Sequence, residues 1–404
     1  MQIKKSILVT FVLSAVFYLA FNLNNLVQEN TSSLLATVFF SKSVDSVELV
    51  SRYDEVANTK SRRRAKENNI NIMIVPGHDN DNSGAMVGNI KESEINLDLG
   101  LKLKKLLEEE KGIDVSIIRD QKGYDSDFEK YLKNNKDEIL EFVNSQKTIM
   151  RDLIEEGKIE SYFNTHGREA LPEVVQTLYG INKYVNDKDF DIVMHIHFND
   201  YPGRVGKVGK HNGFAIYVPE GQYSNAEASY DLAEKIKDQL AVFLPESSLK
   251  QEKYITEDQE YIAIGAYNTV EPISLLIEYG YIYESQFTDY ETGPIFISEL
   301  AKQTYYGITN YLNDKDKITN NFFEDLENYD WDRDLQNGDR GVDVLALQKY
   351  LMSKDYYPHN NNLNLCPLSG YFGDCTEKAL QNYQNDNDIK STGYFGSLTK
   401  KIIK

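Results

Sequence analysis

The strongest constraint on the fold is a short apolar stretch at residues 71–75, which runs directly into Pro76-Gly77-His78. Its apolar, β-branched side chains predict a strand buried on both faces, and the Pro-Gly pair predicts a tight turn after it. The turn leaves His78 just beyond the carboxyl end of the strand, where open α/β sheets place their ligands. Glu92 follows at the predicted start of a helix. An imidazole and a carboxylate supplied in this way form the beginning of a metal site.

The rest of this region alternates between strand and helix patterns. Between two of the strands, residues 121–170 are rich in charge with apolar residues at helical spacing, which predicts an inserted group of helices. The order of elements predicts an α/β fold with a mostly parallel sheet flanked by helices. Further strands are expected at residues 113–118, 191–197, 213–218 and 273–278, and helices at residues 94–111, 226–244 and 294–312.

Three titratable residues fall at the carboxyl ends of predicted strands: His78, His197 and Glu278. Such ends meet at one edge of a parallel sheet, and Glu92 joins them from the loop after His78. Two imidazoles and one carboxylate, with a position left for water, are a ligand set of catalytic zinc. A carboxylate that is not a ligand must then move the proton of the water, and Glu278 is the candidate.

Each of these residues has an alternative. His78 alone would serve to cap the turn, and Glu92 would be favoured at a helix N-terminus without any metal. Glu94 is the alternative acid, and His195 lies on the same strand face as His197. Other residues of the right type are Glu271 and Glu284, in place of Glu278, and His166 and His211, which are expected at the surface.

Four motifs occur in a fixed order: Pro76-Gly-His78, Gly-x-x-x-Glu92-x-x-x-Asn96-Leu97, His-Ile-His197-Phe-Asn199 and Leu-Leu-Ile-Glu278-Tyr-Gly280. Together they resemble the zinc-dependent N-acetylmuramoyl-L-alanine amidases over roughly residues 70–312. The resemblance implies an α/β fold that cleaves the bond between the muramic lactyl group and L-alanine in peptidoglycan. It also implies that His78, Glu92 and His197 hold Zn²⁺ and that Glu278 is the catalytic glutamate.

The chain departs from this family at three places, of which the first is the apparent insertion at residues 121–170. Residues 79–82 are Asp-Asn-Asp-Asn where the family usually has glycines, and His195 stands where it commonly has serine. These departures concern substrate fit and regulation more than the metal.

The C-terminal residues 333–404 carry the element Gly-Tyr-Phe-Gly-x-x-Thr twice, at residues 370–376 and 393–399. Each copy predicts a glycine turn whose Thr lies near the start of a short helix. This stretch resembles the three-helix peptidoglycan-binding domain of many wall hydrolases, preceded by a linker at residues 313–332. A structural helical domain without a ligand is the alternative. The two cysteines, Cys366 and Cys375, are either paired, as export would allow, or free.

The N-terminus begins with basic residues and continues as an apolar run to residue 23, which predicts a signal peptide or a membrane anchor. Residues 24–70 are expected to be a linker, and their basic cluster at residues 60–66 is either solvated or a contact for anionic polymers. The formal charge of −19 argues against binding to nucleic acid. The sequence therefore predicts an exported protein of the cell envelope, either membrane-tethered or secreted.

The function predicted from the sequence is a zinc-dependent N-acetylmuramoyl-L-alanine amidase that acts on peptidoglycan in wall remodelling or lysis. The alternatives are another zinc peptidase of the wall and an inactive wall-anchoring protein. The sequence indicates no particular activating protein partner.

Overall fold

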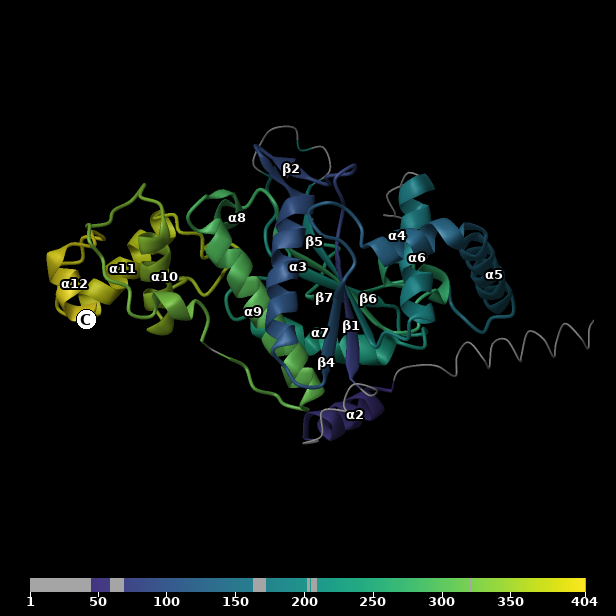
Figure 1. Cartoon of the computed structure of the whole chain (residues 1–404). Coiled ribbons are helices and arrows are strands. Elements are labelled where there is room, and N and C mark those ends of the chain that lie inside the picture. Colours follow the sequence, from purple (N-terminus) through teal and green to yellow (C-terminus); the bar gives the residue numbers. More distant parts are fainter. Residues whose placement is uncertain are drawn as a thin grey trace, which may run out of the picture.

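A computed structural model of the chain describes residues 45–58, 69–162, 172–201, 204, 209–319 and 321–403. Its centre is a six-stranded sheet in the order β4-β1-β5-β8-β6-β7, with helices on both faces (Figure 1). A separate two-stranded hairpin, β2–β3, precedes the first long helix. The strands are β1 (Ile70–Pro76), β2 (Met86–Val87), β3 (Ile90–Lys91), β4 (Ile113–Ile117), β5 (Ile192–Asn199), β6 (Ala215–Pro219), β7 (Ile255–Asp258) and β8 (Ile273–Tyr281).

The predicted α/β fold with a mostly parallel sheet is confirmed. All neighbouring strands of the large sheet run parallel except β6 and β8, which are antiparallel. Strands β1, β5 and β8 are almost continuously buried, as expected for strands covered on both faces. Because β5 and β8 pair in parallel register, His197 lies directly beside Glu278.

Helices cover both faces of this sheet. Helices α3, α7 and α9 pack on one face, while α4, α5 and α6 and the short helices η2 and η3 cover the other (Figure 1). The helices of this part are α2 (Ser46–Asn58), α3 (Glu92–Glu108), α4 (Ser126–Asn134), α5 (Lys136–Glu155), α6 (Pro172–Asp187), η2 (Ile262–Ile264), η3 (Ala266–Asn268), α7 (Ala226–Leu240), α8 (Ser285–Thr288) and α9 (Gly293–Leu312).

Helix α2 lies within the segment for which the sequence predicts a linker. Its apolar residues Leu49, Tyr53 and Val56 recur at helical spacing and are buried. The helix packs against β1, α7 and α9, and Arg52 forms an ion pair with Asp191 next to the start of β5. The segment therefore contributes to the core of the α/β part.

The C-terminal part contains three helices: α10 (Val342–Ser353), α11 (Asp374–Asp386) and α12 (Ser397–Ile403). A buried glutamine holds each copy of the repeated turn. Gln348 Nε2 donates to Tyr371 O and Thr376 Oγ1, both at 2.9 Å. Gln384 Nε2 donates in the same way to the carbonyl of the second turn and to its Thr, at 2.8 and 3.0 Å. The repeat is thus a repeat of hydrogen bonding as well as of sequence.

The segment that joins the two parts is packed at both of its ends. On the α/β side, next to the short helix η4 (Glu324–Leu326), Phe323 lies 4.9 Å from the ring of Phe296. On the C-terminal side, the ring of Trp331 lies 5.2 Å from that of Phe395. One buried apolar cluster therefore runs from the sheet into the helical part.

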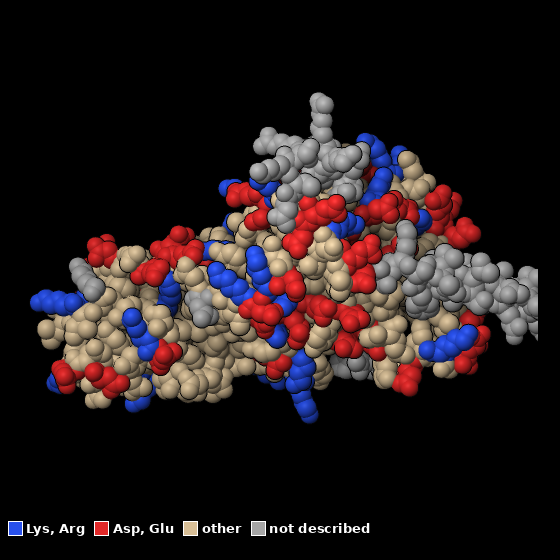
Figure 2. All heavy atoms as spheres, turned by 90° about the horizontal axis from the view of Figure 1, so that it is seen from below, with Lys and Arg blue, Asp and Glu red and all other residues tan. Residues whose placement is uncertain are grey.

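In the described ranges, no helix combines the length and apolar character that crossing a membrane requires. The predicted signal peptide or anchor at residues 1–23 lies outside the described residues. The face on which α2 lies carries many Asp and Glu side chains with Lys and Arg scattered among them (Figure 2). Among the described residues this face has no continuous basic patch, in keeping with the charge of −19.

Candidate metal and catalytic site

Three of the predicted site residues meet at the carboxyl edge of the sheet. His78 follows β1 after a single glycine, Glu92 is the first residue of α3, and His197 lies near the end of β5. His78 adopts a left-handed backbone conformation with φ of 62°. This conformation is uncommon for a residue with a side chain, and such strain is typical of functional sites.

Each oxygen of the Glu92 carboxylate faces one imidazole. Glu92 Oε2 lies 3.1 Å from His78 Nε2, and Glu92 Oε1 lies 3.1 Å from His197 Nδ1. The backbone also fixes this carboxylate, because Ala85 N donates to Oε2 at 2.9 Å and Phe198 N to Oε1 at 3.3 Å. The three ligand atoms lie within 4.8 Å of one another. This arrangement is consistent with a metal site, because two imidazoles and one carboxylate are a typical donor set.

The protonation states also suit a metal. Burial raises the pKa of Glu92, but hydrogen bonds from His197 and His78 outweigh it and hold that pKa well below its usual range. Burial lowers the pKa of His197 despite its contact with the carboxylate. An ionised carboxylate beside a neutral imidazole is the state in which such groups bind metals.

Two glycines leave the space that these side chains occupy. A Cβ on Gly77 would lie 2.1 Å from His197 Cε1, so the ring packs directly on the backbone. A Cβ on Gly84 would lie 2.5 Å from both Glu92 Oε2 and His78 Cδ2, and Gly84 has a φ of 70°. Any larger residue at either position would displace a donor atom.

Arg119 is a residue of the site that the sequence analysis missed. Its side chain is 3% exposed and donates to three backbone carbonyls: Nε to Pro76 O at 3.0 Å, and Nη2 to Gly77 O at 3.0 Å and to Ser93 O at 2.7 Å. A signal was available, because Arg119 directly follows the predicted strand at residues 113–118. The rule that selected His78 and His197 applies to this position as well.

Glu278 lies on β8 beside His197 and is partly buried. Two tyrosines flank it: Tyr217, which lies on β6, and Tyr261, which is the residue before η2. Burial and the nearby charge of Glu278 raise the pKa of Tyr261 to about 12. The ring of Tyr261 lies 4.8 Å from that of Tyr217 in a T-shaped contact. Glu278 therefore lies at the same edge as the three donor residues, in a setting of phenols.

The alternative acids occupy other positions. Glu94 is exposed on α3 and pairs with Lys91 at 2.9 Å. Glu271 precedes β8, at the opposite end of that strand from Glu278. Glu284 is buried and accepts hydrogen bonds from the backbone N–H groups of Tyr281 and Gly213.

Two of the alternative histidines, His195 and His211, are not members of the cluster. His195 is 1% exposed, and burial lowers its pKa to about 3, so it is a neutral residue of the interior. His211 is stacked on Tyr281, with ring centroids 5.8 Å apart. His166 lies outside the described residues.

A second group missed from the sequence is centred on Glu252, which is 6% exposed. Its carboxylate accepts hydrogen bonds from Asn199 at 2.8 Å, Tyr217 at 2.9 Å and Tyr281 at 3.1 Å, and also from Ser247. Three of the four donors come from β5, β6 and β8, so this one carboxylate ties together the strands that carry His197 and Glu278 and their neighbour β6. Glu252 lies in a loop between α7 and β7 that has no strand or helix pattern, so no residue pattern pointed to it.

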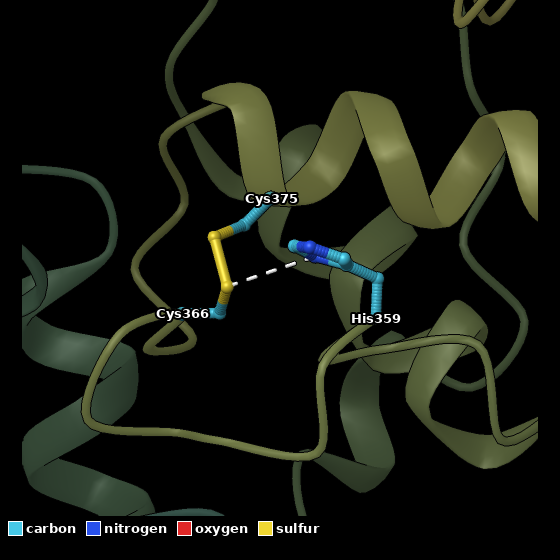
Figure 3. Close-up of side chains that lie close together, drawn as sticks. All are labelled: His359, Cys366 and Cys375. Atoms are coloured by element: carbon cyan, nitrogen blue, oxygen red, sulfur yellow. Dashed lines mark hydrogen bonds between the residues drawn. A yellow bond between two sulfur atoms is a disulfide. The ribbon is translucent and has the colours of Figure 1, made fainter.

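A further group of potential ligands lies in the C-terminal part, where His359 Nδ1 is 3.8 Å from Cys366 Sγ (Figure 3). Cys366 and Cys375 are joined by a disulfide, which settles the alternatives left open by the sequence. Because the two sulfurs are bonded to each other, this group offers one imidazole and no thiolate. The disulfide is therefore a covalent link within the helical part, and the group is not a metal site of thiolates.

A His-Glu-His cluster at the carboxyl edge of such a sheet has the ligand chemistry of a metal-dependent hydrolase. Residues 72–310 match the N-acetylmuramoyl-L-alanine amidase family, and residues 340–403 match a putative peptidoglycan binding domain. The chain belongs to the N-acetylmuramoyl-L-alanine amidase family. Peptidoglycan is therefore its partner, and an enzyme that acts on the wall works in the cell envelope.

Several solved structures are similar to this chain. The CwlD amidase from Clostridioides difficile, in complex with the GerS lipoprotein, is 18% identical over 61% of this chain and 100% of that chain, with a TM-score of 0.40. The catalytic domain of CwlV, an amidase from Bacillus (Paenibacillus) polymyxa var. colistinus, is 18% identical over 61% of this chain and 99% of its own, with a TM-score of 0.37. The N-acetylmuramyl-L-alanine amidase Ami1 from Mycobacterium smegmatis is 14% identical over 61% of this chain and 98% of its own, with a TM-score of 0.39. No curated protein matches this chain.

Proposed function

We propose that this amidase uses Zn²⁺ held by His78, Glu92 and His197, and that Glu278 is its general base and acid. The observation that carries the proposal is the contact of one carboxylate with two imidazoles, each at 3.1 Å, beside a fourth residue of the right chemistry. Zinc in such a site lowers the pKa of a water molecule and polarises a carbonyl group.

The substrate bond is the amide between the lactyl group of N-acetylmuramic acid and L-alanine. In the proposed reaction the Glu278 carboxylate accepts a proton from the attacking water and then donates it to the amine of L-alanine as the C–N bond breaks. Glu278 is supplied by β8, while the three donor side chains come from the turn after β1, the start of α3 and the end of β5. The proposed base, Glu278, and the three proposed metal ligands are therefore supplied at the same edge of the sheet.

The membrane connection and the role of the C-terminal part are further elements of the proposal. We propose that residues 1–23 direct export, with or without cleavage. The C-terminal part is proposed to hold the enzyme on its insoluble substrate, which raises the local concentration of cleavable bonds. We propose residues 71–312, together with α2, as the catalytic domain and residues 333–404 as the peptidoglycan-binding domain.

The test is digestion of purified sacculi by the full chain, with and without a chelator, followed by mass analysis of the products. An amidase releases intact stem peptides and leaves glycan without peptide, and Zn²⁺ added after chelation is expected to restore release. Fragments cut within the stem peptide would instead identify a zinc peptidase. No release by a zinc-loaded chain would support an inactive anchoring protein.

The role of Glu278 is tested by Glu278→Gln, with Glu271→Gln as the matched control before the other end of the same strand. We expect Glu278→Gln to lower kcat by about 10²- to 10⁴-fold, the usual contribution of a general acid–base group. Its zinc content should equal that of the parent chain, and Glu271→Gln should retain full activity. An active Glu278→Gln variant would remove this mechanism.

A further inference from the structure

We infer that Arg119 is a positioning residue that sets the metal affinity of the His78, Glu92 and His197 cluster. The inference rests on the proposed function, since it assigns a role toward the metal proposed for that site. Arg119 contacts none of the three donor side chains through its own hydrogen bonds. Its contacts are with the backbone of the segments that carry two of them.

The guanidinium joins two segments that are separate in sequence. Pro76 O and Gly77 O belong to the turn that precedes His78, and Ser93 O belongs to the residue after Glu92. One side chain therefore fixes the turn of the first ligand relative to the helix start of the second. A change in the position of any of these three carbonyl groups would alter the 3.1 Å contact between His78 and Glu92.

An arginine suits this position better than any other donor. Its planar group presents five N–H donors in fixed directions, whereas a lysine ammonium offers a single centre of donation. The turn also needs such a brace, because His78 has a φ of 62°, which its own conformational preference opposes. Asn96 Nδ2 donates to Gly77 O at 3.0 Å as well, so this carbonyl is held from two sides.

The charge of Arg119 is retained in its buried position. Burial lowers the pKa of this guanidinium, while Tyr124 and then Asp79 act electrostatically in the opposite direction. Asp79 lies on the same turn, directly after His78, and its Oδ2 accepts a hydrogen bond from Tyr124 at 3.2 Å. The loop that carries the first ligand therefore supplies the carboxylate that offsets the buried cation.

The test compares Arg119→Ala, Arg119→Lys and Arg52→Ala in the full chain. Arg52 is a matched control because its ion pair with Asp191 lies at the amino end of β5, remote from the cluster. The dissociation constant of Zn²⁺ is measured by competition with a chromophoric chelator, and unfolding of the metal-free chains is measured in urea. The metal is the probe, so no substrate enters either measurement.

We expect Arg119→Ala to weaken Zn²⁺ binding by about 10- to 100-fold, the usual effect of removing a group that orients a ligand. Arg119→Lys should fold and lose affinity to a smaller degree, since its one donor centre cannot reach all three carbonyls. Methylguanidinium in the buffer is expected to restore affinity to Arg119→Ala and to leave Arg52→Ala unchanged. A purely structural role would lower stability without this selective rescue.

The outcomes separate the inference from the function on which it rests. If the parent chain binds no Zn²⁺, the proposed function fails. If the parent binds Zn²⁺ and both variants, Arg119→Lys and Arg119→Ala, bind it with the affinity of the parent, the inference about Arg119 fails while the proposed function stands. If Arg119→Ala does not fold without metal, Arg119→Lys alone decides between the two results.

Discussion

Glu284, a buried acid, should contribute a pH dependence of its own to the stability of this chain. The side chain is 8% exposed and accepts hydrogen bonds from Tyr281 N at 2.8 Å, Gly213 N at 3.2 Å and Gln286 Nε2 at 2.8 Å. Burial outweighs these three contacts and raises the pKa of Glu284 from 4.5 to about 7. The folded chain therefore keeps this proton over a pH range in which the unfolded chain has lost it.

The sign of the effect follows from proton linkage. Between pH 4.5 and about 7 the folded state binds more protons than the unfolded state, so stability falls as pH rises through this window. A difference of about 2.5 pKa units corresponds to about 3 kcal/mol, at 1.36 kcal/mol per unit. Below pH 4 the free energy of unfolding is not reduced by this group, and above pH 7 the reduction is complete.

Glu284→Gln removes this titration and keeps an oxygen for the two backbone N–H groups. We expect the free energy of unfolding of the variant, relative to the parent, to rise by about 3 kcal/mol between pH 4 and pH 8. The assay is urea unfolding of both chains with a chelator present, so that metal release contributes nothing. Glu227→Gln, at an exposed position on α7, is the control and should show a flat difference. Parallel curves for Glu284→Gln and the parent would refute the reasoning.

Three further predictions concern packing, the repeated turn and the disulfide. Gly77→Ala should weaken Zn²⁺ binding about 10- to 100-fold in a chelator competition, because the new Cβ would lie 2.1 Å from His197 Cε1; unchanged affinity would contradict the packing. Gln384→Ala should destabilise the chain by roughly 2–3 kcal/mol in urea unfolding, since it leaves buried partners without hydrogen bonds; a loss under 1 kcal/mol would count against this. Replacing Cys366 and Cys375 by Ser should cost roughly 2–3 kcal/mol, as expected for the short loop they close, and reductant should lower only the stability of the parent.

Much of this architecture could be predicted from short-range patterns. Apolar runs located β1, β5 and β8, and the rule for strand ends placed His78, His197 and Glu278 at one edge of the sheet. The pairing of β5 with β8 then set Glu278 beside His197. These features depend on local periodicity and chain order, which a single sequence carries.

The residues that were missed act through partners distant in the chain. Glu252 lies in an irregular loop, and its role exists only because donors from three strands converge on it. The place of Arg119 after a predicted strand was a signal for its position, but the hydrogen bonds of its side chain depend on carbonyl directions, which no residue pattern encodes. The antiparallel placement of β6 beside β8 is likewise a matter of chain path through space. Sequence patterns identify elements and strand ends, but long-range side-chain partners need coordinates.

The packed segment between the two parts limits how the enzyme can move on its substrate. Phe322 and Phe323 are buried against the ring of Phe243, and Trp331 is held by Phe395 and by a hydrogen bond to Asp343 O. The helical part also contacts the α/β part directly, because Asn212 Nδ2 donates to Asn364 O at 2.7 Å, and swinging the helical part away would break this hydrogen bond. Under the proposed function, a chain bound to the wall through its helical part would therefore cut bonds at a set spacing from the point of attachment.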